Sequence, residues 1–161
     1  SLHAYTIVQE SDTIVETIIT GGYNKTAHRA GTGYCYEERN GEFHTPGTIN
    51  ILVFTNKALT DSAMVKAIMT ITEAKTAALQ NWQVESTDEV QKYNINVDHS
   101  LAKEVHTSAT GTATDGIVLT IDTNGDLLTD AGSYSLFGDT LAKAVYIGVQ
   151  RALTLAIEFD D

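Results

Sequence analysis

Hydrophobic and polar residues alternate over short segments in the first third of the chain. AYTIVQES (4–11) and TIVETIIT (13–20) are rich in β-branched residues, and each ends at polar residues or glycine, which is typical of strands. We expect these two segments to pair. TINILVFTN (48–56) follows a turn at Pro46 and consists mostly of apolar and β-branched residues, which favours a central strand covered on both faces.

Two later segments have the period of an amphipathic helix. In the segment 59–79, Thr60 or Asp61 is the expected N-cap. Its predicted apolar face consists of Met64, Val65, Ile68, Ile71, Ala78 and Leu79. The final helix is expected to begin with Asp139 as its N-cap. Its predicted apolar face consists of Leu141, Val145, Gly148, Val149, Ala152, Leu155 and Ala156.

Between the helices, KYNINVD (92–98) and GIVLTID (116–122) read as strands, and the Asn-Gly pair at 124–125 predicts a hairpin turn. No repeat or low-complexity segment marks a domain boundary. We therefore expect a single α+β domain over residues 1–161, with two long amphipathic helices packed on a mixed, mostly antiparallel sheet. An α/β arrangement is the alternative.

Composition narrows the classes of partner. The formal net charge of −11 argues against nucleic acid, which is bound by clustered lysine and arginine. The single cysteine, Cys35, excludes an internal disulfide framework, and we find neither a leader nor an apolar run of membrane-spanning length. We expect a soluble cytoplasmic protein without a membrane partner, and the strands and apolar helix faces leave a homodimer open.

Lys75 occupies an unusual place for a lysine. At 100° per residue it falls near the centre of the apolar face of the first helix, while Glu73 falls on the opposite, solvated side. Burial of an unpaired ammonium costs several kcal/mol, so Lys75 must snorkel, pair with a carboxylate or lose its proton. A structural ion pair and a functional lysine are the two interpretations.

The segment ATGTATDGIVL (109–119) places Asp115 at the entrance of a predicted central strand, behind Thr110, Thr112 and Thr114. Such a loop is either a polar binding surface or a turn whose hydroxyls bond to the backbone. No local base is evident for a threonine nucleophile. The five histidines show no metal-ligand spacing, so no metal site is predicted; His44, beside Pro46, is the histidine that we expect to reach a site.

Four segments together resemble the adenosylcobinamide amidohydrolase family of cobamide salvage. They are TGGYNKTAHRAG (20–31), PGTINILVFTNKALTDSAMVKAIMTITEAKTAAL (46–79), ATGTATDGIVL (109–119) and GDTLAKAVYIGVQRAL (138–153). They occur in the family's order and span nearly the whole chain. The resemblance implies hydrolysis of the amide that joins aminopropanol to the corrin ring, which releases adenosylcobyric acid. The corrinoid is then substrate, and no cofactor is expected.

The resemblance makes 109–119 a site loop that shares one pocket with PGTIN and TEAK. The expected catalytic residues are Asp115 as base or water-positioning group, Lys75 as a charge in the pocket, and Thr112 and Thr114 as amide or oxyanion ligands. Substrate contacts are expected from Asn24, Arg29, His44, Thr48, Asn50, Glu73, Thr110 and Gly111.

The chain departs from the family pattern in two places. Members commonly carry a long additional N-terminal portion. Their turn before the last helix usually contains a glycine-lysine-histidine run, where this chain has Gly132, Ser133 and Tyr134. A corrinoid-binding or regulatory module without hydrolysis, and a hydrolase of another amide on the same scaffold, are therefore alternatives.

Overall fold

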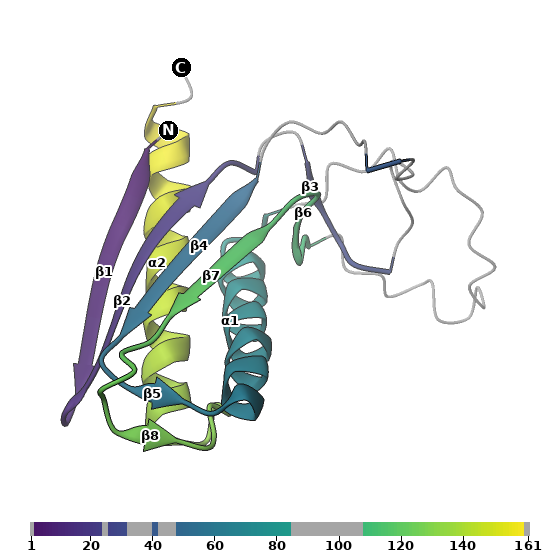
Figure 1. Cartoon of the computed structure of the whole chain (residues 1–161). Coiled ribbons are helices and arrows are strands. Elements are labelled where there is room, and N and C mark those ends of the chain that lie inside the picture. The colour runs from purple at the N-terminus through teal and green to yellow at the C-terminus, as the bar shows by residue number, and fades with distance from the viewer. Residues whose placement is uncertain (1, 24–25, 32–39, 42–47, 85–107, 160–161) are drawn as a thin grey trace.

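The computed structural model describes residues 2–23, 26–31, 40–41, 48–84 and 108–159. Its main element is a four-stranded sheet in the order β1-β2-β4-β7, backed on one face by two helices (Figure 1). The strands are β1 (His3–Glu10), β2 (Thr13–Gly21), β4 (Ile49–Thr55) and β7 (Gly116–Thr120), and the helices are α1 (Asp61–Asn81) and α2 (Leu136–Glu158). The β1–β2 and β2–β4 pairs are antiparallel, and β4–β7 is parallel. The predicted mixed, mostly antiparallel α+β fold is confirmed.

Two short ladders lie at opposite ends of this sheet (Figure 1). At the end where β4 and β7 begin, β3 (Ala27–His28) pairs antiparallel with β6 (Gly111–Thr112). At the other end, β5 (Ala58–Leu59) pairs parallel with β8 (Leu127–Leu128). The predicted Asn-Gly turn forms, since Gly125 donates its N–H to Asp122 O at 3.0 Å. The hairpin prediction is wrong, because β8 pairs with β5 and not with β7.

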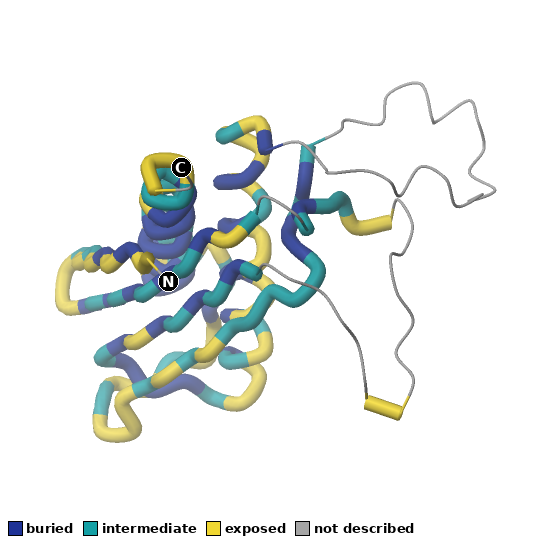
Figure 2. Tube along the Cα trace, turned by 90° about the horizontal axis from the view of Figure 1, so that it is seen from above, coloured by how far each residue is buried: buried dark blue, intermediate teal, exposed yellow. Residues whose placement is uncertain are grey.

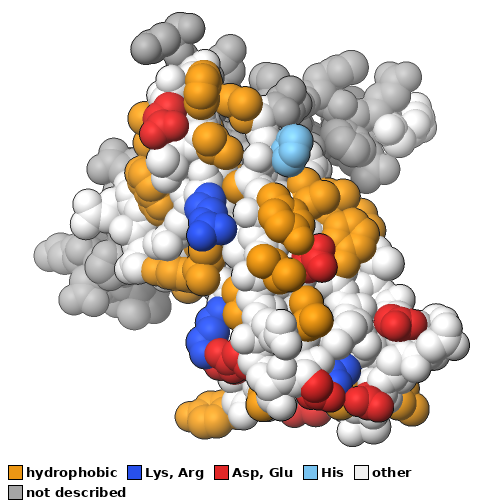
Figure 3. Space-filling model, turned by 90° about the vertical axis from the view of Figure 1, so that its left-hand side faces the viewer, with side chains coloured by type: hydrophobic (Ala, Val, Ile, Leu, Met, Phe, Trp, Pro, Cys, Tyr) orange, Lys and Arg blue, Asp and Glu red, His pale blue; other side chains and the backbone are white. Residues whose placement is uncertain are grey.

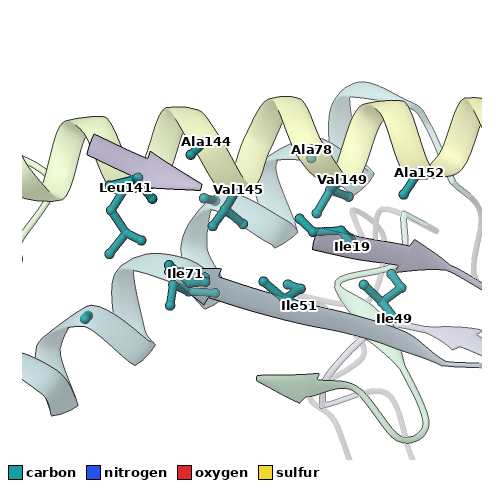
Figure 4. Close-up of a cluster of buried hydrophobic side chains, with 14 of the residues drawn as sticks. Ile19, Ile49, Ile51, Ile71, Ala78, Leu141, Ala144, Val145, Val149 and Ala152 are labelled. Atoms are coloured by element: carbon teal, nitrogen blue, oxygen red, sulfur yellow. The ribbon is translucent and has the colours of Figure 1, made fainter. Parts of the chain in front are cut away.

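The core lies between the inner face of the sheet and the two helices (Figure 4). Ile19 from β2 and Ile49 and Ile51 from β4 are fully buried, together with Val145 and Val149 from α2. Each such side chain contributes about 1.5–3 kcal/mol through its removal from water. The periodicity of two residues along β2 and β4 explains why every second residue enters this core, as Figure 2 shows.

A glycine sets how closely α2 approaches the sheet. A Cβ added to Gly148 would lie 2.8 Å from the side chains of both Thr17 and Ile19 on β2. The helix can therefore approach β2 this closely only because Gly148 has no side chain. The nearby Thr17 hydroxyl donates to Ala144 O at 3.4 Å, so the same contact also includes a polar link.

The outer face of the sheet is not covered by any described residue. Tyr5, Ile7 and Val118 are each more than half exposed, and Phe54 on β4 is 37% exposed. The prediction that β4 is covered on both faces is therefore wrong for the described part of the chain. Viewed from the β1 side, hydrophobic side chains are spread over the face of the molecule that Figure 3 shows. The homodimer that the apolar pattern left open remains a prediction.

Both helices confirm the predicted periodicity, and the structure corrects the phase of α1 alone. On the predicted apolar face of α2, all residues are buried except Leu155 and Ala156, which are half-buried. In α1, Val65 and Ile68 are 66% and 38% exposed, so they do not belong to the buried face. The buried face of α1 instead consists of Ala63, Ala67, Thr70, Ile71, Ala74, Lys75, Ala78 and Leu79. The small alanine side chains of this face allow α1 to approach α2 and the sheet closely. The predicted face was chosen mainly from large apolar residues, so it did not include most of these alanines.

The helix starts are also defined by hydroxyl caps. Thr60 caps α1 by accepting from Ala63 N, as one of the two predicted alternatives. In α2 the N-cap is Ser135, which accepts from Gly138 N at 2.9 Å, and not Asp139. Asp139 lies inside the first turn, where its negative carboxylate interacts favourably with the positive end of the helix dipole.

None of the helices that the structure describes is long and apolar enough to cross a membrane. The strand predicted over 92–98 lies outside the described residues.

Candidate active site

A buried ion pair lies where β4 and β7 begin. Lys75 extends from α1 and its Nζ contacts Asp115 Oδ2, while Asp115 immediately precedes β7. The two side chains are only 10% and 13% exposed, so water solvates neither charge fully. The expected burial of Lys75 on α1 is thus confirmed, and of its three alternatives the structure shows pairing with a carboxylate. An ion pair at this depth is costly to build, which makes the position a candidate for function.

Four donors surround the carboxylate of Asp115. Besides Lys75, the N–H of Thr112 donates to Oδ2 at 3.1 Å, and the hydroxyl of the same threonine donates to Oδ1. The N–H of Ile49 donates to Oδ1 at 3.3 Å. A carboxylate has about four lone-pair positions, so these contacts use its acceptor capacity. Asp115 is thereby fixed in place by β4, β6 and α1 at once.

Gly111 brings the loop against this pair. A Cβ at Gly111 would lie 2.5 Å from Asp115 Oδ2 and 2.9 Å from Lys75 Nζ. Any other residue would displace the ion pair, because real Cβ atoms do not approach so closely. The glycine in the 109–119 loop therefore serves close approach to two charged groups, which explains why hydroxyl and glycine residues precede the strand.

Hydroxyl and amide groups continue around the pair. Thr48 donates its hydroxyl to the carbonyl of Thr114, and Thr76 on α1 donates to the carbonyl of Thr110 at 3.3 Å. Asn50 donates its side-chain N–H to Thr20 Oγ1 at 3.2 Å. The structure thus brings Thr48 and Asn50 together with Lys75 of TEAK and with the 109–119 loop. Thr20 and Thr76 also contact these residues, although neither was predicted as a site residue.

The remaining predicted residues fall in three different situations. Arg29 donates to Ser108 O at 3.4 Å, beside the β3–β6 ladder and close to the loop. Glu73 is exposed on the outer side of α1, so the structure does not bring it to the Lys75 side of the helix. Asn24 and His44 lie outside the described residues.

His28 is a residue of this region that sequence reasoning did not assign to the site. It lies on β3, directly opposite Gly111 on β6. Its Nδ1 is buried, and in the described structure it has no hydrogen-bond partner. The only signal in the sequence is its place in TGGYNKTAHRAG, because the register that sets it opposite Gly111 is not visible before the ladder is known.

No group of three or more His, Cys, Asp or Glu side chains that could hold a metal occurs among the described residues. The arrangement as built offers a buried ammonium, a fixed carboxylate, several hydroxyls and an amide. Such groups can bind a polar amide and stabilise a negatively charged oxygen that develops on it.

A family model described as adenosylcobinamide amidohydrolase matches residues 1–160 of the chain. The chain belongs to the adenosylcobinamide amidohydrolase family. An uncharacterized protein of Methanocaldococcus jannaschii is 40% identical over 107 residues, which cover 66% of this chain and 36% of that protein. The chain thus spans about a third of the length of this relative. No solved structure matches the chain.

The departure from the family pattern at Gly132–Tyr134 lies away from the ion pair. Gly132 is near Lys66, in the first half of α1, since a Cβ there would be 3.3 Å from Lys66 Cε. At a helical rise of 1.5 Å per residue, Lys66 and Lys75 are about 13 Å apart along the helix. Tyr134 itself is fully exposed. The change at this turn therefore removes no group from the surroundings of Lys75 and Asp115.

Proposed function

We propose that this member of the family hydrolyses the amide between aminopropanol and the corrin ring of adenosylcobinamide, giving adenosylcobyric acid. The observation that carries the proposal is the family match over residues 1–160, combined with a buried charged site built from the segments that resemble the family. Family membership supports a hydrolase in general, and the reaction on this substrate is the step that we infer.

The proposed roles follow from the contacts of the ion pair. Lys75 has three N–H donors, and in the described structure one of them is used, on Asp115. The remaining donors suit the carbonyl oxygen of the substrate amide, whose negative charge grows when water attacks the carbon. Asp115 orients Lys75. Thr112 holds Asp115 from both its N–H and its hydroxyl, which makes it a positioning residue in this scheme.

The substrate-binding roles remain proposals for the polar groups around the pair. Thr48, Asn50 and Thr114 lie at the beginnings of β4 and β7, and Thr110 immediately precedes β6. A corrin side-chain amide that enters here can reach Lys75. A corrinoid is much larger than this cluster, so most of its contacts must lie outside the ion pair. We propose that the corrinoid is the substrate and that the chemistry uses no resident cofactor.

The test is product formation by the purified chain from adenosylcobinamide. Chromatography and mass spectrometry should detect adenosylcobyric acid and free aminopropanol. Asp115→Asn should lower the rate by at least about 100-fold, as expected when a charged site is disrupted. Asp12→Asn is the matched control, because Asp12 also accepts from a buried lysine, at the opposite end of the sheet. Full turnover by Asp115→Asn would contradict the assigned role.

One observation favours a second candidate function, corrinoid binding without hydrolysis. The carboxylate of Asp115 already accepts four hydrogen bonds, so it has no open position for a proton from water. Saturable changes in the visible spectrum of the corrinoid, without any product, would support this binding function.

A further inference from the structure

A hydrolytic site around Lys75 needs a group that moves protons, and Asp115 is poorly placed to do so. Amide hydrolysis requires a proton to leave the attacking water and another to reach the departing nitrogen. All four acceptor positions of Asp115 are occupied by Lys75, Thr112 and Ile49. A different residue with an open nitrogen or oxygen must therefore perform this step.

Resting on the proposed function, we propose that His28 is the proton-transfer residue of this site. The first observation is its Nδ1, which is buried and without a hydrogen-bond partner in the described structure. A buried polar atom without a partner costs about 1–3 kcal/mol, so such an atom calls for an explanation. A ligand that supplies the missing hydrogen bond explains it.

The second observation is the position of His28 in the β3–β6 ladder. His28 lies directly opposite Gly111, and opposed residues of an antiparallel pair project from the same face with Cβ atoms about 4.5–5.5 Å apart. The missing side chain of Gly111 points at Lys75 Nζ and Asp115 Oδ2. From this register we infer that His28 projects on the same side of the ladder as the missing side chain of Gly111.

The distance across the ladder and the distance from Gly111 to Lys75 together limit how far the Cβ of His28 lies from Lys75 Nζ. A Cβ at Gly111 would be 2.9 Å from Lys75 Nζ. The Cβ of His28 is therefore within about 8.5 Å of that nitrogen, a gap that an imidazole ring and one substrate group can span.

The proposed step is balanced as follows. Neutral His28 accepts a proton from water while the water oxygen bonds to the amide carbon, and Lys75 donates a hydrogen bond to the carbonyl oxygen. The carbon–nitrogen bond then breaks, and imidazolium His28 gives its proton to the departing nitrogen. The products are a carboxylic acid and aminopropanol, with His28 neutral again.

The experiment compares wild-type protein with His28→Gln, His28→Ala and the control His3→Gln, all with adenosylcobinamide. His3 is exposed on β1 and outside the ion-pair region. We expect His28→Gln to lower kcat by about 100-fold or more, the usual contribution of a general acid–base, with KM within about threefold. Added imidazole should restore part of the activity of His28→Ala. His3→Gln should match wild type.

The outcomes separate the two proposals. If wild type forms no product, the proposed hydrolysis fails, and the role of His28 fails with it. If wild type is active and His28→Gln stays within threefold of it, the proposed hydrolysis stands and the role of His28 is overturned. A loss of activity that imidazole does not restore, accompanied by a lower Tm, would also overturn it, because that pattern indicates a structural residue.

Discussion

Lys57 and Lys75 are both buried lysines, yet their carboxylate partners are in opposite environments. Lys57, at 5% exposure, contacts Asp12 at 2.7 Å and Asp126 at 3.1 Å, and both aspartate side chains are at least 70% exposed. Lys75 contacts Asp115, whose side chain is only 13% exposed. The first arrangement leaves its negative charges in water, whereas the second removes both charges from it.

We infer from this difference that Lys57 has a structural role, in contrast to the functional role proposed for Lys75. Lys57 joins the β1–β2 turn to the segment after β7, and its carbonyl accepts from Asp122 N at 3.1 Å. Its partners remain hydrated, so only the lysine loses its water in this contact. The Lys75 pair carries the larger desolvation cost, and such a cost is typically retained where a site uses the charge.

The largest expected effect is on activity, from Lys75→Met. Methionine has a similar volume, and Asp115 would keep three of its four donors, so the fold should persist. Loss of a donor to the developing oxyanion should lower kcat by about 100- to 1000-fold. The measurement is the turnover of Lys75→Met and of Lys57→Met on the same substrate. Lys57→Met should stay within about twofold of wild type. Equal activity of the two variants would contradict the difference in role between the two lysines.

The next effect is on stability, from Asp115→Ala. This change leaves Lys75 buried without its partner, which should cost about 3–5 kcal/mol of the free energy of unfolding. Because the cost comes from an uncompensated charge, the double variant Lys75→Met/Asp115→Ala should recover much of it. Urea unfolding of the single and double variants measures both quantities. A double variant no more stable than Asp115→Ala would show that the ion pair is not the cause.

Lys57→Met should have a smaller effect on stability. The lysine holds two turns together, but its partners are already hydrated, so neither aspartate is left buried. We expect Tm to fall by about 5 °C. Differential scanning calorimetry measures this shift, with Lys143→Met on the surface of α2 as the control. A fall in Tm as large as that of Asp115→Ala would contradict the inference that the Lys57 contacts carry the smaller cost of desolvation.

The smallest expected effect is the pH dependence of the stability that Asp12 contributes. The hydrogen bond from Lys57 lowers the pKa of Asp12 below its usual value of 3.8. Its stabilising contribution is thus present above about pH 4 and is lost as the pH falls through the lowered pKa. The hydrogen bonds to Asp12 and Asp126 raise the pKa of Lys57, so its contribution persists until the solution is more alkaline than its usual value of 10.5.

Asp12→Asn should therefore lower Tm by about 1–3 °C near neutral pH, with no difference from wild type near pH 2. Thermal unfolding of both proteins across this pH range measures the difference. A difference that is constant down to the lowest pH would mean that the charge of Asp12 is not what stabilises the turn.

The sequence predicted the elements that depend on local pattern. The β1–β2 pair, the strand β4, the cap Thr60 and the burial of Lys75 all follow from periodicity within a few residues. The exposure of Val65 was not predictable in this way, because alanines on the neighbouring stripe pack more closely against α2.

Features that depend on long-range pairing were not predicted. The Asn-Gly signal gave a turn but no hairpin, since β8 finds its partner in β5. Strand β7 was expected to be central and lies at the edge of the sheet. His28 and Lys57 each acquire their surroundings from residues far away in the chain, and no local pattern marks such contacts.

The parallel pairing of β4 with β7 has a consequence for how the protein folds. A parallel pair cannot close through a tight turn, so the chain must leave β4 at Thr55, form α1 and return at Gly116 before the two strands meet. Contacts so distant in sequence form slowly, because the loop between them must be closed first. Asp115 reaches Lys75 only when β7 arrives, so the charged site is completed late, after the β1–β2 hairpin and α1 have formed.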